Sequence, residues 1–182
     1  MAGRREQILD TAAAMFAERG FHGVSVADLG AACGISGPAL YKHFESKDAM
    51  LAEMLIDISE QLLRVGRERS AAAADAREAL RGLVAWHIDF ALHHKPLIVL
   101  QDRDWSSLPD DARELVRGLQ RRYVELWADR LREVHDDLTP RRARAMAHAT
   151  FGMLNSTPHS AMLPEPEMAS VLEGMALRAL RV

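Results

Sequence analysis

The stretch from residue 24 to residue 47, VSVADLGAACGISGPALYKHFESK, constrains the fold more than any other part of the chain. Ser25, followed three residues later by Asp28, forms a capping pair that starts a short helix, and a glycine ends it. Ser36 is placed as the next N-cap, and Pro38 suits the first turn of a second helix, where an N–H has no partner within the helix. Helix, glycine turn and short helix are typical of a helix-turn-helix whose second helix enters the DNA major groove.

The side chains that face outward from this second helix suit contact with DNA. Small residues let the backbone approach base edges, Tyr41 and His43 offer hydrogen-bonding tips, and Lys42 is a cation for phosphates. The N–H groups at the helix starts add neutral donors for phosphate oxygens. The predicted DNA-binding residues are Ser25, Ser36, Gly37, Pro38, Tyr41, Lys42, His43 and Lys47. The open alternative is that an all-α domain with no role on DNA contains such a helix pair.

The segment from Arg4 to about Leu55 resembles the N-terminal DNA-binding domain of the TetR/AcrR family of transcriptional regulators. The matching features are the opening ILDTAAAMFAERG, the Gly-Ile-Ser turn at 34–36, the LYKHF run at 40–44 and the SK pair that follows. The resemblance implies a homodimeric regulator, most often a repressor, that leaves a palindromic operator when a small effector binds. Gly37 and Pro38 occupy positions that vary in the family, so no operator sequence is implied.

Composition favours helices throughout the 182 residues, because alanine, leucine and arginine are abundant and no alternating β-branched stretch occurs. We therefore expect an all-α fold, with a three-helix helix-turn-helix head and a C-terminal helical bundle that dimerises. No signal sequence or membrane span is evident, which predicts a cytoplasmic protein without membrane contact. Bulk charge does not support DNA binding, since residues 1–50 carry five Arg or Lys and six Asp or Glu. The prediction of DNA binding rests instead on where the cations lie in the sequence.

A long helix from Ser46 to about Arg69 connects the head to the remainder, so we place the head at residues 1–48 and the ligand-binding and dimerisation domain at 49–182. The last two predicted helices carry more apolar surface than a small bundle covers, and two copies would form a four-helix interface. The alternative is that both faces serve only the intramolecular core. The predicted interface residues are Ala147, Thr150, Leu154, Met168, Leu172 and Met175.

Polar residues within the apolar stripes of the C-terminal part indicate a small-molecule site. The predicted pocket residues are Trp86, His87, Phe90, His94, Trp105, Tyr123, Trp127, Phe151 and Asn155. A metal site is the alternative, since four histidines are candidates to converge, namely His87, His94, His148 and His159. Their spacing matches no common zinc pattern and no carboxylate or cysteine joins them, so we predict neither a metal nor another cofactor.

The sequence contains no Gly-rich phosphate loop, no nucleophile-elbow serine and no paired carboxylates on an apolar helix face, which argues against an enzyme. A carrier or storage protein with an incidental helix-turn-helix is the other non-enzyme hypothesis. We predict a ligand-responsive DNA-binding regulator, a repressor released from a palindromic operator by a small effector. The C-terminal part resembles family members that respond to lipophilic or acyl-type compounds, which implies an effector of that kind. Its partners would be double-stranded DNA, the effector and a second copy of the chain.

Overall fold

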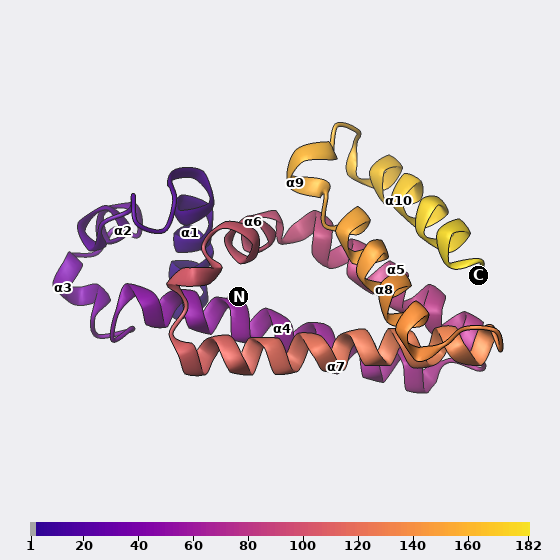
Figure 1. Cartoon of the computed structure of the whole chain (residues 1–182). Helices are drawn as coiled ribbons and strands as arrows, with labels where there is room; N and C mark the ends of the chain where they lie inside the picture. The colour runs from indigo at the N-terminus through magenta and orange to yellow at the C-terminus, as the bar shows by residue number, and fades with distance from the viewer. Residues whose placement is uncertain (1–2) are drawn as a thin grey trace. The chain divides into compact units, whose positions relative to one another are not determined.

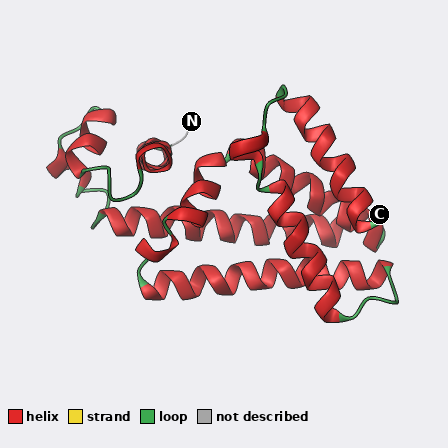
Figure 2. Cartoon of the chain, turned by 45° about the horizontal axis from the view of Figure 1, so that its top comes forward, coloured by secondary structure: helices red, strands yellow, loops and turns green. Residues whose placement is uncertain are grey.

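The computed structural model describes residues 3–182, and within them the chain forms α-helices and one 3₁₀ turn but no strand (Figures 1 and 2). The all-α prediction is confirmed. In chain order the elements are α1 (Arg4–Arg19), α2 (Val26–Ala32), α3 (Gly37–Leu40), α4 (Lys47–Ala72), α5 (Ala76–His93), α6 (Lys95–Arg103), η1 (Trp105–Ser107), α7 (Asp110–Val134), α8 (Pro140–Leu154), α9 (Thr157–Ser160) and α10 (Glu165–Leu180). None of the described helices is both long enough and apolar enough to cross a membrane.

The chain divides into two compact units that are not contiguous in sequence. Unit 1 combines the residues up to Ile58 with Pro96–Val116, and unit 2 combines Ser59–Lys95 with Arg117–Val182. Helices α4 and α7 each pass from one unit into the other. The simple division after residue 48 stays a prediction, but the compact unit around the head also contains α6, η1 and the first turns of α7.

The caps expected from the sequence of the head are present. The Ser25 hydroxyl accepts a hydrogen bond from the Asp28 N–H at 3.1 Å, and the Asp28 carboxylate accepts from the Ser25 N–H at 2.9 Å. The Ser36 hydroxyl accepts from the Ala39 N–H at 3.3 Å. Each cap satisfies donors that a helix start leaves without a partner, so the positions of α2 and α3 follow from local sequence.

The core of unit 1 joins the head to a distant part of the sequence. Apolar side chains of α1, α2 and α4 pack with residues from the segment 96–116, and the fully buried ones include Phe16, Leu29, Leu51, Leu100 and Val116. Residues 97–100 of this segment lie in α6. Pro96 lies in the first turn of α6, where its missing N–H breaks no helical hydrogen bond.

The core of unit 2 is built by α5, α8 and α10 together with the parts of α4 and α7 in that unit. Helix α10 packs against both α5 and α8, and the contributing side chains include Leu80, Leu83, Ala147, Leu172 and Ala176, all at most 2% exposed. Gly66 of α4 permits a close approach to α7, because a Cβ there would lie 2.8 Å from the Tyr123 ring. These contacts hold the helices that carry the second candidate site.

Candidate functional site

The turn between α2 and α3 depends on two glycines. Gly34 has a φ of 66°, which suits a residue without a side chain, and the Ile35 N–H donates to the Gly30 carbonyl at 2.9 Å. A Cβ on Gly30 would lie 2.8 Å from the Ile35 oxygen and 3.0 Å from the Gly37 nitrogen. Gly30 therefore lets α3 sit close against α2. The sequence identified Gly34 as the turn glycine. The spacing of apolar residues did not reveal that Gly30 is needed for the close approach of α2 and α3.

The outward face of α3 and the turn that follows carries most of the predicted DNA contacts. Regular helix ends at Leu40, and 41–43 continue as turns in which the His43 N–H donates to the Leu40 carbonyl at 2.9 Å. Tyr41 is 56% exposed, and the other exposed members of the predicted set are Ser25, Ser36, Pro38 and Lys42. Gly37 and His43 are half-buried. An aromatic hydroxyl and an ammonium group thus project from one short element.

Lys47 has a different position from the one expected. Its half-buried ammonium group donates to the carbonyls of Phe21 at 2.6 Å and Val24 at 2.8 Å, and it lies 4.4 Å from the Phe21 ring centroid. These contacts connect the start of α4 to the loop between α1 and α2. The predicted DNA contact by Lys47 is corrected, because its ammonium group donates to carbonyls within the head.

Five predicted pocket residues form an aromatic cluster in unit 2. The rings of His87 and Phe151 stack at 4.7 Å between centroids, and Tyr123 lies parallel to Phe151 at 5.5 Å. Trp127 and Phe90 meet His87 edge-on, at 6.0 and 5.5 Å. We call His87, Phe90, Tyr123, Trp127 and Phe151 the aromatic cluster. Helices α5, α7 and α8 bring its members together from distant parts of the sequence.

The aromatic cluster contains buried polar atoms without partners. The His87 Nε2–H donates to the Asn155 Oδ1 at 3.0 Å, so the neutral ring presents Nδ1 as an acceptor. That Nδ1, the Tyr123 hydroxyl and the Trp127 N–H make no hydrogen bond with any residue that the structure describes. Burial lowers the pKa of His87 to about 4 and raises the pKa of Tyr123 above its ordinary value. Buried polar atoms of this kind bond either to an ordered water or to a bound ligand.

Three predicted pocket residues lie apart from the aromatic cluster or at its edge. The Trp86 N–H donates to the Leu62 carbonyl at 3.2 Å, and its ring lies under the Arg69 guanidinium, so this side chain packs against α4. His94 stacks on Phe90 at 5.8 Å. Trp105 belongs to unit 1 and packs against the core of that unit, so its placement in the pocket is corrected.

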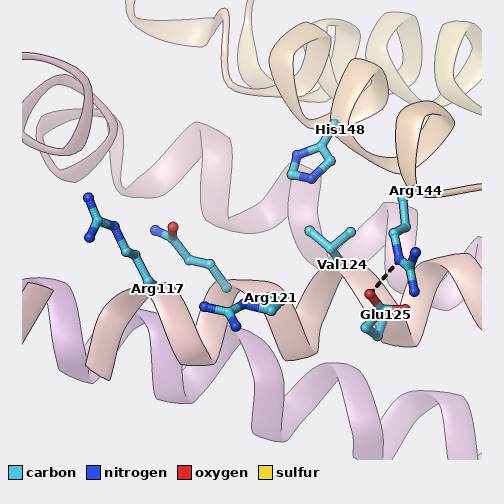
Figure 3. A pocket seen from close by; sticks show the side chains of 7 residues that line it. Arg117, Arg121, Val124, Glu125, Arg144 and His148 are labelled. Carbon is cyan, nitrogen blue, oxygen red and sulfur yellow. Dashed lines mark hydrogen bonds and ion pairs between the residues drawn. The ribbon is translucent and has the colours of Figure 1, made fainter. Parts of the chain in front are cut away.

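A basic pocket lies between α7 and α8 within unit 2, with a volume of about 290 Å³ (Figure 3). Arg144 and His148 come from α8, and the Arg144 Nε donates to Glu125 at 2.6 Å. That interaction raises the pKa of Arg144. We call this site the basic pocket, and the residues that line it are Arg117, Gln120, Arg121, Val124, Glu125, Arg144 and His148. Sequence reasoning considered only His148, although the spacing of 117, 121 and 124 puts them on one face of a helix.

Two family profiles match the chain: bacterial regulatory proteins of the tetR family over residues 8–54, and the tetracyclin repressor-like C-terminal domain over 73–159. The chain belongs to the TetR family. The repressor KstR2 of Rhodococcus jostii is 33% identical over 127 residues, which cover 69% of this chain and 62% of that relative. The match therefore spans less than two thirds of the length of KstR2.

Solved TetR-family structures share the fold. PfmR from Thermus thermophilus superimposes with a TM-score of 0.85 at 27% identity, covering the whole of this chain and 97% of PfmR. AibR, whose crystal structure contains isovaleryl coenzyme A and operator DNA, has a TM-score of 0.77 at 21% identity, covering 95% of this chain and 97% of AibR. In the TetR-family chain described here, α2 and α3 form the helix-turn-helix expected from the sequence.

The predicted dimer interface needs correction in most of its positions. Five of its six members are at most 6% exposed within the single chain and serve its own core, namely Ala147, Thr150, Leu154, Met168 and Leu172. Met175, at 47% exposed, is the member that lies on the surface. Large apolar side chains that sequence reasoning missed are exposed on or just before α10, namely Met162, Leu163 and Val171. The apolar stripe in the sequence did not show which face of α10 is buried in the chain's own core and which face is exposed.

The described residues do not bring three His, Cys, Asp or Glu side chains together in a way that would hold a metal ion. Of the four candidate histidines, His87 donates to Asn155, His94 stacks on Phe90 and His148 lines the basic pocket. His159 is exposed on α9. These four histidines therefore do not meet at one metal site within the part of the chain that the structure describes.

Proposed function

We propose that this TetR-family chain is a transcriptional repressor that binds a palindromic operator as a homodimer and leaves it when a small lipophilic or acyl-type effector binds unit 2. The relatives support the repressor, operator and effector parts of this proposal. KstR2 is a transcriptional repressor, and AibR was solved with both an acyl coenzyme A and operator DNA. A protein that acts on bacterial DNA works in the cytoplasm, and the chain is proposed to act as a binding protein rather than an enzyme.

The observation that carries the DNA-binding part is the exposure of Tyr41 and Lys42 next to a capped and tightly turned α3. Local interactions hold α3 in place, so the side chains that follow it are presented without prior rearrangement. Lys42 would neutralise a phosphate, while Tyr41 offers a hydroxyl and a ring edge to the groove. Head residues Ser25 and Ser36 mark helix starts whose N–H groups favour phosphate oxygens.

The aromatic cluster supports the effector part of the proposal. It provides apolar and aromatic surface together with three buried polar atoms that lack partners, which is the composition of a small-molecule site. An effector that opens the packing around Tyr123 would act on α7 directly and on α4 at Gly66. Because α4 and α7 each contribute residues to both units, a displacement of either helix is a physical route to the head. A coupling of about 1–3 kcal/mol is enough for such a switch.

The test is to select DNA fragments that bind the purified protein and to measure their retention by the variants Tyr41→Ala and Lys42→Ala. Lys42→Ala should weaken binding to all sequences and reduce the salt slope by about 0.9 for each phosphate that is no longer neutralised. Tyr41→Ala should cost about 1–3 kcal/mol if the side chain reads a base. Arg67→Ala is the matched control, since Arg67 is an exposed cation of α4 in unit 2. Equal retention by all four proteins would contradict the assignment.

A further inference from the structure

The basic pocket is a concave site whose cations outnumber its acids. Three arginines line it against one carboxylate, and that carboxylate, Glu125, is engaged by Arg144 at 2.6 Å. Arg121, on the same helix α7, pairs with no carboxylate of the lining, and its positive charge favours the entry of an anion. A site of this kind selects a ligand of high negative charge.

Arg121 is the side chain best placed to bind such a ligand. It is exposed, it lines the pocket, and it makes no hydrogen bond or ion pair with another residue in the described part of the chain. A guanidinium offers paired N–H donors in a planar fork that matches two phosphate oxygens. The Gln120 amide and the His148 imidazole add further donors beside it. Phosphate fits this set better than a carboxylate, because it presents three oxygens to donors from two helices.

The size and surroundings of the basic pocket indicate that it takes only part of a ligand. About 290 Å³ lies at the lower limit of the usual range of ~300–1,000 Å³ for small-molecule sites. Its apolar wall, Val124, follows Tyr123 on α7, and the His148 ring meets Phe151 edge-on at 6.4 Å. Tyr123 and Phe151 belong to the aromatic cluster, so the basic pocket and the aromatic cluster adjoin within unit 2.

We propose that the basic pocket binds the phosphate groups of an acyl thioester of coenzyme A, with Arg121, Arg144 and His148 as its contacts. This inference rests on the proposed function, because it names the chemical class of the effector. The apolar acyl end would lie toward the aromatic cluster and the phosphorylated end would remain in the basic pocket, near solvent. An unphosphorylated lipid carrying the same acyl group would lack the charge that this pocket recognises.

The first experiment measures binding to the phosphorylated part alone, by isothermal titration of the full chain with coenzyme A and with pantetheine, which lacks the nucleotide phosphates. Coenzyme A should bind and pantetheine should not. Arg121→Ala should weaken coenzyme A binding about tenfold, the effect of losing a charge-assisted hydrogen bond. Arg132→Ala is the matched control, because Arg132 is also an exposed arginine of α7, lies outside the basic pocket, and should leave the affinity unchanged.

The inference is overturned by equal affinity of Arg121→Ala and the unmodified protein, by equal binding of pantetheine, or by no binding of coenzyme A at millimolar concentration. Inorganic phosphate that competes as well as coenzyme A would identify a site for the free anion and would also overturn it.

Operator release then separates the two proposals. If an acyl pantetheine releases the protein from the operator as effectively as the acyl coenzyme A does, the proposed function is kept and the phosphate site is rejected. If coenzyme A binding depends on Arg121 but no acyl thioester releases the protein from the operator, the acyl effector is rejected and the phosphate site is kept.

Discussion

The ammonium group of Lys47 donates a hydrogen bond to the main-chain carbonyl of Val24 at 2.8 Å. The same group donates to Phe21 and lies against its ring, so one lysine connects the first turn of α4 to the loop that precedes α2. A residue expected to contact DNA directly therefore holds together the part of the head that presents α3. Its influence on DNA binding would act through the position of α2 and α3.

Replacing Lys47 by Met should lower the free energy of unfolding by about 2 kcal/mol, because two hydrogen bonds from a charged donor are removed while the length of the side chain is kept. Urea denaturation followed by circular dichroism would measure the change. Lys42→Met is the control, since Lys42 is exposed and should affect DNA binding but not stability. If both variants unfold at the same urea concentration as the unmodified protein, the structural role of Lys47 is refuted.

Arg103 of α6 should be required for a stable head. Its guanidinium donates to the carbonyls of Phe16 and, at 3.0 Å, Ala17, the last turn of α1, and it pairs with Asp104, which is 7% exposed. Arg103→Gln would leave a nearly buried carboxylate without its partner and should destabilise the protein by about 1–3 kcal/mol. Thermal unfolding would show a lower midpoint, and Arg132→Gln should not change it. An unchanged midpoint in Arg103→Gln would contradict this assignment.

His87 should make stability fall in mildly acidic solution. Its pKa is about 4 in the folded chain and 6.5 in the unfolded chain, so the unfolded state takes up the proton first as the pH decreases. Stability is unaffected by this group above pH 6.5, decreases between 6.5 and 4, and changes no further below 4. The full effect is about 3 kcal/mol, at 1.36 kcal/mol for each pKa unit.

The variant His87→Gln isolates this effect, because glutamine retains a donor for Asn155 but does not titrate near neutral pH. Chemical denaturation of both proteins across this pH range should give curves that diverge as the pH falls, with the unmodified chain losing more stability. Parallel curves would show that the imidazole is not protected from protonation.

The exposed apolar face of α10 is the proposed contact between two copies. Val171 and Met175 lie four residues apart and are 42% and 47% exposed. Val171→Glu combined with Met175→Glu should convert a dimer into a monomer, because burying two carboxylates in an apolar interface is strongly unfavourable. Light scattering after gel filtration would report the mass, and operator retention should be lost in parallel.

Leu115→Glu is the control for that experiment, because Leu115 is an equally exposed apolar residue, at 44%, on α7 in unit 1. It should leave the mass unchanged. A monomeric mass for the unmodified chain at micromolar concentration would refute the proposed dimer, and an unchanged mass in the double variant would place the contact elsewhere.

The head was predictable because its signals are local. Ser25, Ser36 and Pro38 mark helix starts within four residues of the bonds they make, and Gly34 marks a turn by its own backbone requirement. The same local logic failed for Lys47, since a lysine beside a helix-turn-helix has the same sequence signature whether its ammonium faces DNA or the carbonyl of Val24. Only the fold of the preceding loop distinguishes these two cases.

The sequence by itself determined most of the helices and their caps, the helix-turn-helix and the residue types available for an effector site, because these depend on interactions between residues a few positions apart. Tertiary structure decided which side of each helix became core. It buried Leu172 while leaving Val171 exposed, placed Trp105 in unit 1, and brought Arg121 and Arg144 to one pocket from two helices. The physical reason is that a hydrophobic stripe indicates only that a face is buried, whereas the partner that buries it depends on packing between segments far apart in the chain.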